Sequence, residues 1–314
     1  MYKAQRILVP TDFSSHAEAA LEHAVVMGAR YGAEITLLHV DEFNVSPLGA
    51  LGIRDASVDA YQKRKVDFLN DQLDSLARSV QNSVVRVKTQ VAQGRAYKVI
   101  IEEGERQEYD LIVIATHGLT ALSTHLIGST AERVVRLSRQ PVLSVCDRPR
   151  HGGKVESILC PTDLSPAANV ALTYALSIAI EQKSTLYIQY VSELEKPERS
   201  DEVRARMPDL LEHHPQAQNV KVEYIFDRDV EPSNSIIRFA IDRQISLIVM
   251  STHGRKGLRR VFIGNNTAEV VRQSEEPVLT VTHPVHRTVF VQPVTEPRKT
   301  PKTWGKPKQG GNGT

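Results

Sequence analysis

The stretch that decides the fold is residues 7–14, ILVPTDFS, because it returns at residues 158–165 as ILCPTDLS. A second stretch behaves in the same way: residues 111–118 read LIVIATHG and residues 247–254 read LIVMSTHG. Repeats must be found first, since overlooking one misreads the whole architecture. The period here has the size of a domain, which excludes a solenoid of short repeats and predicts two copies of one fold in tandem.

The spacing between the copies locates one insertion. The first pair of motifs is 151 positions apart and the second pair is 136 apart, so the first copy carries 15 additional residues between its two motifs. The best place for them is Phe43–Val58, a segment that contains Pro47 and has little periodicity. A long insertion at a strand end costs little loop entropy. Such a loop can line a site, but a surface excursion without a role is the simpler interpretation.

Composition supports two water-soluble domains. A chain of 314 residues suits two domains of ~150 residues. Hydrophobic residues make up 41% and charged residues 24%, as in globular proteins. No apolar run approaches the roughly 20 residues that span a bilayer, and no secretory signal precedes the first expected strand. The two cysteines, Cys146 and Cys160, form no CxxC pair. We therefore expect a reduced, cytoplasmic location and no membrane partner.

The C-terminal tail differs from the rest of the chain. Residues 286–314 hold six Arg and Lys against one Glu, a net charge of +5, which leaves −3 for the remainder. This tail is rich in Pro, Gly and Lys, a composition that predicts disorder. A basic tail can touch nucleic acid or an anionic surface, but a solvated end is favoured and no nucleic-acid partner is expected. The expected divisions are domain 1 at 1–148, domain 2 at 154–285 and a basic disordered tail at 286–314.

Strands and helices alternate along each copy. The apolar run Arg6–Pro10 is typical of a strand buried on both faces. Ser14 and Ser15 can cap the next helix, with Glu18 completing a capping box, and Ser165-Pro166 has the same place in the second copy. Further strands are expected at Ile35–Val40, Val84–Val91, Asp110–Ala115 and Pro141–Cys146, and further helices at Asp59–Ser79, Tyr97–Gln107 and Ser129–Ser138. Alternation implies parallel pairing with right-handed crossovers. The fold class is α/β: two tandem doubly wound domains, each a five-stranded parallel sheet flanked by helices.

The repeated residues fall where such a sheet binds ligands, beyond the carboxyl ends of its strands. Thr11-Asp12 follows the first strand, Val40-Asp41 the second, and Ala115–Gly118 the fourth. Gly128-Ser129-Thr130 opens the last helix, with Glu132 at capping-box spacing from Ser129. Glycine lets backbone approach a phosphate closely, and a helix N-terminus supplies unpaired N–H groups. Asp12 can accept a hydrogen bond from an adenine amino group or a ribose hydroxyl.

These motifs together resemble those of the universal stress protein family. The opening PTDFS, the THG of the fourth strand and the spacing Gly-x₂-Gly-x₉-Gly-Ser/Thr carry the resemblance over residues ~4–147 and ~154–284. It implies an adenine nucleotide alpha hydrolase-like fold and, in the ATP-binding branch, contacts to adenosine by Asp12 and Val40. The same resemblance implies that Gly118, Gly128, Ser129 and Thr130 hold the phosphates of ATP, with or without Mg²⁺. The full set of candidate nucleotide-binding residues is Pro10, Thr11, Asp12, Val40, Ile114, Ala115, Gly118, Gly128, Ser129, Thr130, Asp163, Val191, Gly254, Gly264 and Asn265.

The resemblance also implies an assembly. Members of the family form dimers through their last strands, so we expect the two domains to be an intramolecular pseudo-dimer that pairs Val142–Val145 with Val278–Val281. This pairing would also cover exposed sheet edges. A homodimer of the whole chain is a further expectation.

Both copies depart from the family pattern. The first glycine is replaced by Ala115 and Ser251, which is tolerable only where the backbone φ is ordinary. In the second copy the hydroxyl position is Asn265; Asn caps helices well and its amide can donate to a phosphate. The second copy also has Ser246 in place of Asp110. An acidic stretch at Asp227–Glu231 takes the place of Gln93-Gly94-Arg95, and its negative charge would disfavour ATP. The first copy is therefore the expected nucleotide site.

Structural roles compete with functional ones at several positions. His117 and His253 are kept in both copies, but no nucleophile accompanies them, and a turn residue is favoured over a general base. Asp12 and Asp163 can equally cap a turn or contact a ligand. Both cysteines are expected to be inert. The cluster Arg255, Lys256, Arg259 and Arg260 fits an anionic partner or a solvated loop equally well. The sequence indicates no metal site and contains no Walker A sequence.

Three functions remain open from the sequence. The first is a regulatory adenine-nucleotide-binding protein of the stress response, without enzymatic activity beyond a weak ATPase. The second is a slow ATPase or phosphotransfer enzyme, for which Asp12, Asp41 and His117 are the available catalytic groups. The third is a scaffold that binds no nucleotide.

Overall fold

The computed structural model describes residues 2–42, 56–80, 85–117, 127–148, 153–193, 200–212, 214–252 and 264–282. Several sequence expectations lie outside these residues: Gly118, Gly254, His253, the basic cluster at 255–260, most of the insertion at Phe43–Val58, and the tail.

Domain 1 contains five strands and four helices within the described residues. In chain order they are β1 (Arg6–Thr11), α1 (Ser15–Tyr31), β2 (Glu34–Asp41), α3 (Ala56–Val80), β3 (Arg86–Gln93), α4 (Ala96–Arg106), β4 (Leu111–Ala115), α5 (Ser129–Leu137) and β5 (Val142–Val145). Every element expected from the sequence is present, with ends shifted by at most three residues; α3 begins at Ala56 and β5 ends at Val145.

Domain 2 repeats the order with a shorter second connection. Its elements are β6 (Ser157–Pro161), α6 (Pro166–Gln182), β7 (Thr185–Glu193), α7 (Ser200–Arg206), two 3-10 helices (Pro208–Leu211 and Pro215–Asn219), β8 (Val222–Asp229), α8 (Pro232–Asp242), β9 (Leu247–Ser251), α9 (Asn265–Gln273) and β10 (Val278–Val281). The 25-residue α3 of domain 1 is thus matched by a seven-residue α7 and the 3-10 helices.

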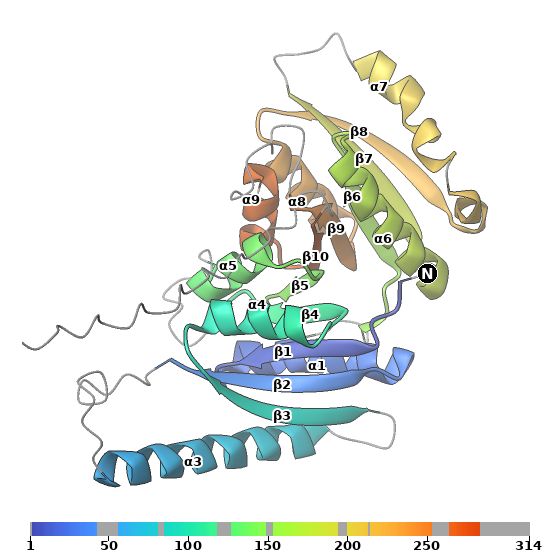
Figure 1. Ribbon diagram of the computed structural model, residues 1–314. Helices are drawn as coiled ribbons and strands as arrows, with labels where there is room; N and C mark the ends of the chain where they lie inside the picture. Colours follow the sequence, from blue (N-terminus) through green and yellow to red (C-terminus); the bar gives the residue numbers. More distant parts are fainter. Residues whose placement is uncertain are drawn as a thin grey trace, which may run out of the picture.

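The ten strands form one sheet in the order β3-β2-β1-β4-β5-β10-β9-β6-β7-β8 (Figure 1). Pairing within each domain is parallel, whereas β5 and β10 pair antiparallel, with Leu143 opposite Leu279. The expected pseudo-dimer through the last strands is therefore confirmed. Backbone groups at the edge of β5 form hydrogen bonds with β10, so the two five-stranded sheets join into one continuous sheet.

Helices cover both faces of this sheet. One hydrophobic core contains residues of α1, α3, α6 and α7, including Leu21, Leu73 and Leu172. The other contains residues of α4, α5, α8 and α9, including Ile100, Val134 and Val270. Strands buried on both faces need this double cover, which explains their continuous apolar runs. The doubly wound α/β fold expected from the sequence is confirmed.

The starts of the helices correct two capping assignments. The N-cap of α1 is Ser14, whose hydroxyl accepts from the backbone N–H of Ala17, so the capping box assigned to Ser15 and Glu18 is wrong. Ser165 caps α6 in the same way, with Pro166 at the first position, as expected. The N-cap of α5 is Gly128 and no side chain caps it, so Glu132 forms no capping box with Ser129. No helix in the described part of the chain is long and apolar enough to cross a membrane.

Candidate functional site

The candidate site of domain 1 lies where the strand order reverses. From β1 the chain goes outward to β2 and β3, and then returns to β4 and β5 on the other side of β1. Because β1 and β4 pair in parallel, their carboxyl ends lie together at one edge of the sheet. Thr11 ends β1 and Ala115 ends β4. The repeated motifs of the sequence therefore converge on the switch point, as expected.

The loop after β1 is held by its own side chains. Thr11 Oγ1 accepts from Phe13 N and Asp12 Oδ1 accepts from Ser14 N, both at 3.0 Å. These bonds stabilise Phe13 at φ +64°, a conformation that is uncommon for a residue other than glycine. In domain 2, Thr162 and Asp163 make the same two bonds at 3.0 Å, and Leu164 has φ +61°. The PTDxS repeat therefore encodes a tight strand-to-helix turn.

This turn decides one of the two roles considered for the aspartates. Asp12 and Asp163 each use one carboxylate oxygen to cap the turn, which is the structural role. A carboxylate has further acceptor sites, so capping and a ligand contact are compatible. Asp12 is partly exposed and lies one residue beyond the end of β1.

The start of α5 presents backbone donors to the same edge of the sheet. Gly128 N donates to Thr116 O at 2.7 Å, which ties the N-cap to the end of β4. The first N–H groups of a helix have no partner within the helix, and the N-cap of α5, Gly128, has no side chain to cap them. Ser129 is exposed and Thr130 is half-buried at this terminus. The helix dipole and the N–H groups of the first turn favour an anion at this point.

Among the described residues, neither backbone geometry nor packing requires glycine at position 128 or 264. Gly128 has φ −61° and Gly264 has φ −59°, which any residue adopts. A Cβ at Gly128 would lie 3.5 Å from Thr116 O, and one at Gly264 would lie 3.7 Å from Thr252 O, both ordinary contacts. The missing side chains leave room for something outside the described chain, as a closely approaching ligand needs. Ala115 and Ser251 are not among the residues with positive φ, so their substitution for glycine is tolerated.

The remaining candidates of domain 1 surround this edge with different exposure. Pro10, Thr11, Ile114 and Ala115 are buried in the strands, so mainly their backbone can face a ligand, whereas Val40 is half-buried. Asp41 is 3% exposed and pairs with Lys65 of α3 at 2.7 Å. This ion pair anchors α3 to the end of β2.

The structure places His16 beside His117, a pairing that the sequence did not predict. The ring of His117 lies 5.6 Å from the ring of His16, in the first turn of α1. Nδ1 of His117 is 2.9 Å from the hydroxyl of Thr116. Copy comparison could not find His16, because the equivalent residue of domain 2 is Ala167.

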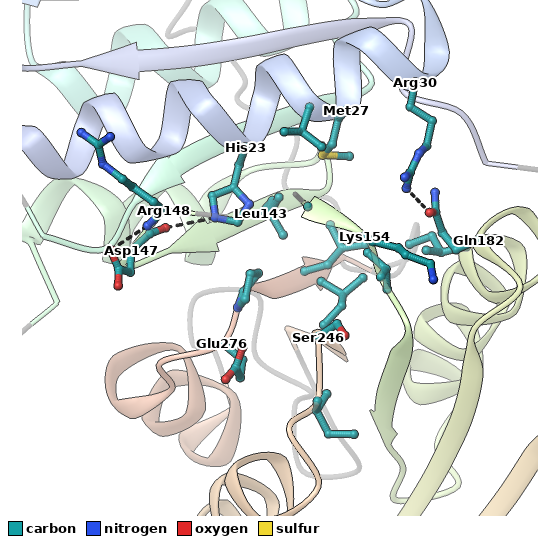
Figure 2. Close-up of a pocket in the computed structure, with 18 of the residues that line it drawn as sticks. His23, Met27, Arg30, Leu143, Asp147, Arg148, Lys154, Gln182, Ser246 and Glu276 are labelled. Atoms are coloured by element: carbon teal, nitrogen blue, oxygen red, sulfur yellow. Dashed lines mark hydrogen bonds between the residues drawn. The ribbon is translucent and has the colours of Figure 1, made fainter. Parts of the chain in front are cut away.

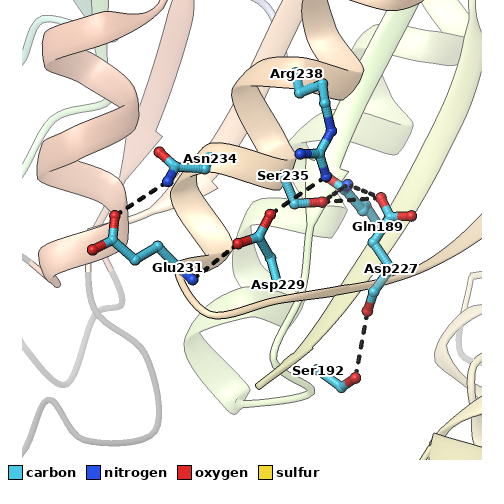
Figure 3. Close-up of polar contacts among 8 residues, drawn as sticks. All are labelled: Gln189, Ser192, Asp227, Asp229, Glu231, Asn234, Ser235 and Arg238. Carbon is cyan, nitrogen blue, oxygen red and sulfur yellow. Dashed lines mark hydrogen bonds and ion pairs between the residues drawn. The ribbon is translucent and has the colours of Figure 1, made fainter. Parts of the chain in front are cut away.

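Domain 2 has the same strand-to-helix turn as domain 1 but different buried side chains near it. Gln189 is fully buried, and its Nε2 donates to Asp227 Oδ2 at 2.7 Å and to Ser235 Oγ at 3.3 Å (Figure 3). By the register of the sheet, the residues of domain 1 equivalent to Gln189 and Asp227 are Leu38 and Ala92. Oε1 of Gln189 has no hydrogen-bond partner among the described residues. An apolar interior beside the strand ends of domain 1 is therefore polar in domain 2.

The acidic stretch of domain 2 is largely engaged with its surroundings. Asp229 accepts from Glu231 N at 3.2 Å and pairs with Arg238 at 3.4 Å, and Glu231 accepts from Asn234 (Figure 3). These contacts partly offset the negative charge that was expected to disfavour ATP. Val191 is half-buried, like Val40. Asn265 was expected to cap α9, but the N-cap is Gly264 and Asn265 is the first residue of the helix.

The replacement of Asp110 in domain 1 by Ser246 in domain 2 does not change the candidate nucleotide sites. Asp110 Oδ2 accepts from Gln5 N and Arg6 N at 2.9 Å, and Ser246 Oγ accepts from Glu156 N and Ser157 N at 3.2 and 3.4 Å. Both residues bind backbone at the amino ends of the strands, opposite to the carboxyl ends. Their role is structural in both domains.

The two cysteines differ in burial and in their contacts. Cys160 is fully buried in β6, and burial raises the pKa of its thiol to about 12. Cys146 follows β5 and its thiol donates to Glu275 O at 3.1 Å. Among the residues with described positions, no three His, Cys, Asp or Glu side chains are grouped as a metal site would require.

Comparison with known proteins identifies the family. The model of the universal stress protein family matches residues 3–145 and 154–282. Universal stress protein MJ0577 of Methanocaldococcus jannaschii is 31% identical over 157 residues, covering 46% of this chain and 95% of the relative. Universal stress protein Slr1230 of Synechocystis is 23% identical over 299 residues, covering 88% of this chain and 99% of the relative.

A solved structure shows the same fold over both domains. A universal stress protein from Archaeoglobus fulgidus aligns with a TM-score of 0.70 at 21% identity, covering 90% of this chain and 97% of that one. The two family matches correspond to the two halves of the ten-stranded sheet. The chain therefore belongs to the universal stress protein family, with two family domains in tandem.

Proposed function

We propose that this chain is a regulatory nucleotide-binding protein of the stress response, which binds ATP in domain 1. One observation carries the proposal: α5 begins at Gly128, which has no capping side chain and which neither its φ nor its packing against the described residues requires to be glycine. It lies at the switch point beside the Asp12 turn. The N-terminus of a helix suits a phosphate group. Adenine and ribose would lie toward Asp12 and Val40, as the family resemblance implies.

Three differences favour domain 1 over domain 2. The helix that opens the domain 1 site carries hydroxyls at Ser129 and Thr130, whereas Asn265 and Asn266 take these places in domain 2. His16 adds a ring beside the domain 1 site that Ala167 cannot replace. The polar cluster around Gln189 alters the interior of domain 2. The same positions of the family motif, Asp163, Val191, Gly254, Gly264 and Asn265, are the proposed residues of a weaker or inactive second site.

A binding role is favoured over an enzymatic one by the partners of the three catalytic candidates. Asp12 caps a turn, Asp41 pairs with Lys65, and His117 contacts Thr116. General-base chemistry needs a group aimed at its substrate. Mg²⁺ would enter with ATP, bound chiefly by phosphates and water, since it commonly takes few protein ligands in nucleotide sites.

The test is calorimetric titration of ATP into the full chain and into two matched variants, Gly128→Val and Gly264→Val. Both substitutions meet only ordinary contacts at the Cβ, and both remove a glycine N-cap, so their cost to folding is similar. We expect one site in the parent, lost in Gly128→Val and retained in Gly264→Val. Loss only in Gly264→Val would move the site to domain 2, and no binding to the parent would refute the ATP proposal.

Turnover separates the binding protein from an enzyme. Phosphate release from ATP, measured at saturation in the parent and in Gly128→Val, should be equal in both. Release that depends on Gly128 would establish an ATPase instead. A nucleotide-free parent that neither binds nor hydrolyses ATP would leave the scaffold as the remaining function.

A further inference from the structure

A cavity of about 300 Å³ lies between the two domains, separate from both strand-end sites (Figure 2). It is lined by α1, the linker at Gly153–Val155, α6 and the central strands, and by none of the candidate nucleotide-binding residues. An apolar cavity of roughly 150 Å³ holds one benzene ring. This one therefore has room for a molecule of about two rings, and domain interfaces are a common place for ligand pockets.

The floor of the cavity is apolar and comes equally from both domains. Each of the four central strands contributes one leucine: Leu111 of β4, Leu143 of β5, Leu279 of β10 and Leu247 of β9. Leu143 and Leu279 are opposite each other in the antiparallel pair that joins the domains. All four belong to the core on the α1 and α6 face of the sheet. An occupant would thus rest an apolar surface on this floor.

The walls of the cavity differ between the domains. Met27 of α1 lines one wall, and Ile178, its equivalent in α6, lines the other. Tyr31 and its equivalent Gln182 also line the cavity but differ in chemistry. Two identical domains would build identical walls, whereas the tandem chain presents an asymmetric pocket that can orient a ligand.

One end of the cavity holds an arginine whose side-chain partner is neutral. Arg30, in the last turn of α1, and Lys154 of the linker lie at the same end, next to Gln182 (Figure 2). The guanidinium of Arg30 donates to the side-chain carbonyl of Gln182, a neutral partner. Lys154 pairs with Glu156 at 2.8 Å, and both of these side chains are exposed. Asp147 and Glu276 lie away from Arg30 in the same view. Because its partner Gln182 is neutral, the Arg30 guanidinium can bind an anionic group at this end.

We propose that this interdomain cavity binds a small amphipathic organic acid. The apolar body lies on the four leucines, and the carboxylate lies against Arg30, where it displaces or shares the contact with Gln182. This site is independent of the nucleotide site, since the two share no residue.

The probes for the test are naphthoate, naphthalenemethanol and naphthylmethylamine, which share one ring system and differ in charge. Titrations into the full chain follow naphthyl fluorescence. We expect saturable one-to-one binding that is tightest for naphthoate, weaker for the alcohol and weakest for the amine. Saturating ATP and the variant Gly128→Val should leave naphthoate binding unchanged, which keeps this result distinct from the nucleotide proposal. Equal binding of all three probes, or none that saturates, would overturn the assignment.

Two variants place the ligand in the cavity. Arg30→Gln should weaken naphthoate about tenfold and leave the alcohol unchanged. The matched control is Arg78→Gln, since Arg78 is an exposed arginine in the last turn of α3. Met27→Trp should abolish binding of both probes by filling the space. If Met27→Trp does not fold, the Arg30→Gln result stands alone; naphthoate binding that is the same in Arg30→Gln and Arg78→Gln refutes the proposal.

Discussion

The linker between the domains offers the sharpest test of the structure, through Gly153. This glycine has φ +71°, and a Cβ at this position would lie 2.4 Å from Cγ1 of Val26 in α1. Gly32 is the matched control, because its φ is +66° and a Cβ there would meet nothing within 4 Å. Both substitutions by alanine incur the same left-handed backbone cost. Only Gly153→Ala adds a steric clash between the linker and α1.

The magnitude follows from these two terms. Alanine at positive φ costs about 1–2 kcal/mol, partly offset by the lower entropy of the unfolded chain, about 0.4–1 kcal/mol. Gly32→Ala should therefore lower the free energy of unfolding by about 1 kcal/mol. Overpacking adds about 1–3 kcal/mol, so we expect about 2–4 kcal/mol for Gly153→Ala.

Urea unfolding of the full chain, followed by circular dichroism, measures both values through the transition midpoint. Val26→Ala removes the clashing methyl groups, so the double variant Val26→Ala, Gly153→Ala should be more stable than additivity predicts by about 1 kcal/mol. Equal losses for Gly153→Ala and Gly32→Ala, or strict additivity in the double variant, would refute the packing of the linker on α1.

Three further predictions concern buried polar groups. Lys65→Met should destabilise the protein by about 2 kcal/mol in urea unfolding, because it removes the cation that pairs with the buried carboxylate of Asp41, which is 3% exposed. The control Lys88→Met breaks an exposed ion pair with Glu34 and should cost less than about 1 kcal/mol. Equal costs for the two variants would contradict the buried position of the Asp41–Lys65 pair. Burial lowers the pKa of His23 below 6.5, so its contribution to stability is present above that pH and is lost as the pH falls through the folded pKa. The free energy of unfolding should therefore fall less steeply from about pH 7 to 5 in His23→Gln than in the parent. Parallel curves for the two proteins would contradict this prediction. Gln189→Leu removes a donor from the Asp227 carboxylate, so adding Asp227→Val should restore stability in thermal unfolding, and a further loss in the double variant would contradict the polar cluster.

The turns and helix starts show how much local sequence can predict. Thr11, Asp12 and Ser14 bond to backbone within three residues, so their order in the sequence is sufficient to specify the turn and the start of α1. Predicted ends were less accurate where two candidates were adjacent. Ser14, rather than Ser15, caps α1 because its extended backbone places the hydroxyl over Ala17 N.

The copy comparison predicted part of the candidate site and missed the rest. Residues repeated in both domains, such as Gly128 and Gly264, were found because they recur at constant spacing. His16 has no counterpart in domain 2, and only the packing of α1 against the end of β4 brings it to His117. The exchange of Asp110 for Ser246 looked functional, but the fold places both at the amino ends of the strands.

The sequence alone determined the tandem α/β architecture, because periodicity, caps and turn motifs act over short distances and occur twice. The family resemblance carried by those motifs predicted the pairing of β5 with β10. Only the tertiary structure decided which unlike surfaces meet at that junction. The interdomain cavity is formed by Arg30, Lys154 and four leucines that are far apart in the chain. Their proximity follows from the strand order and the antiparallel join, long-range contacts that no local pattern specifies.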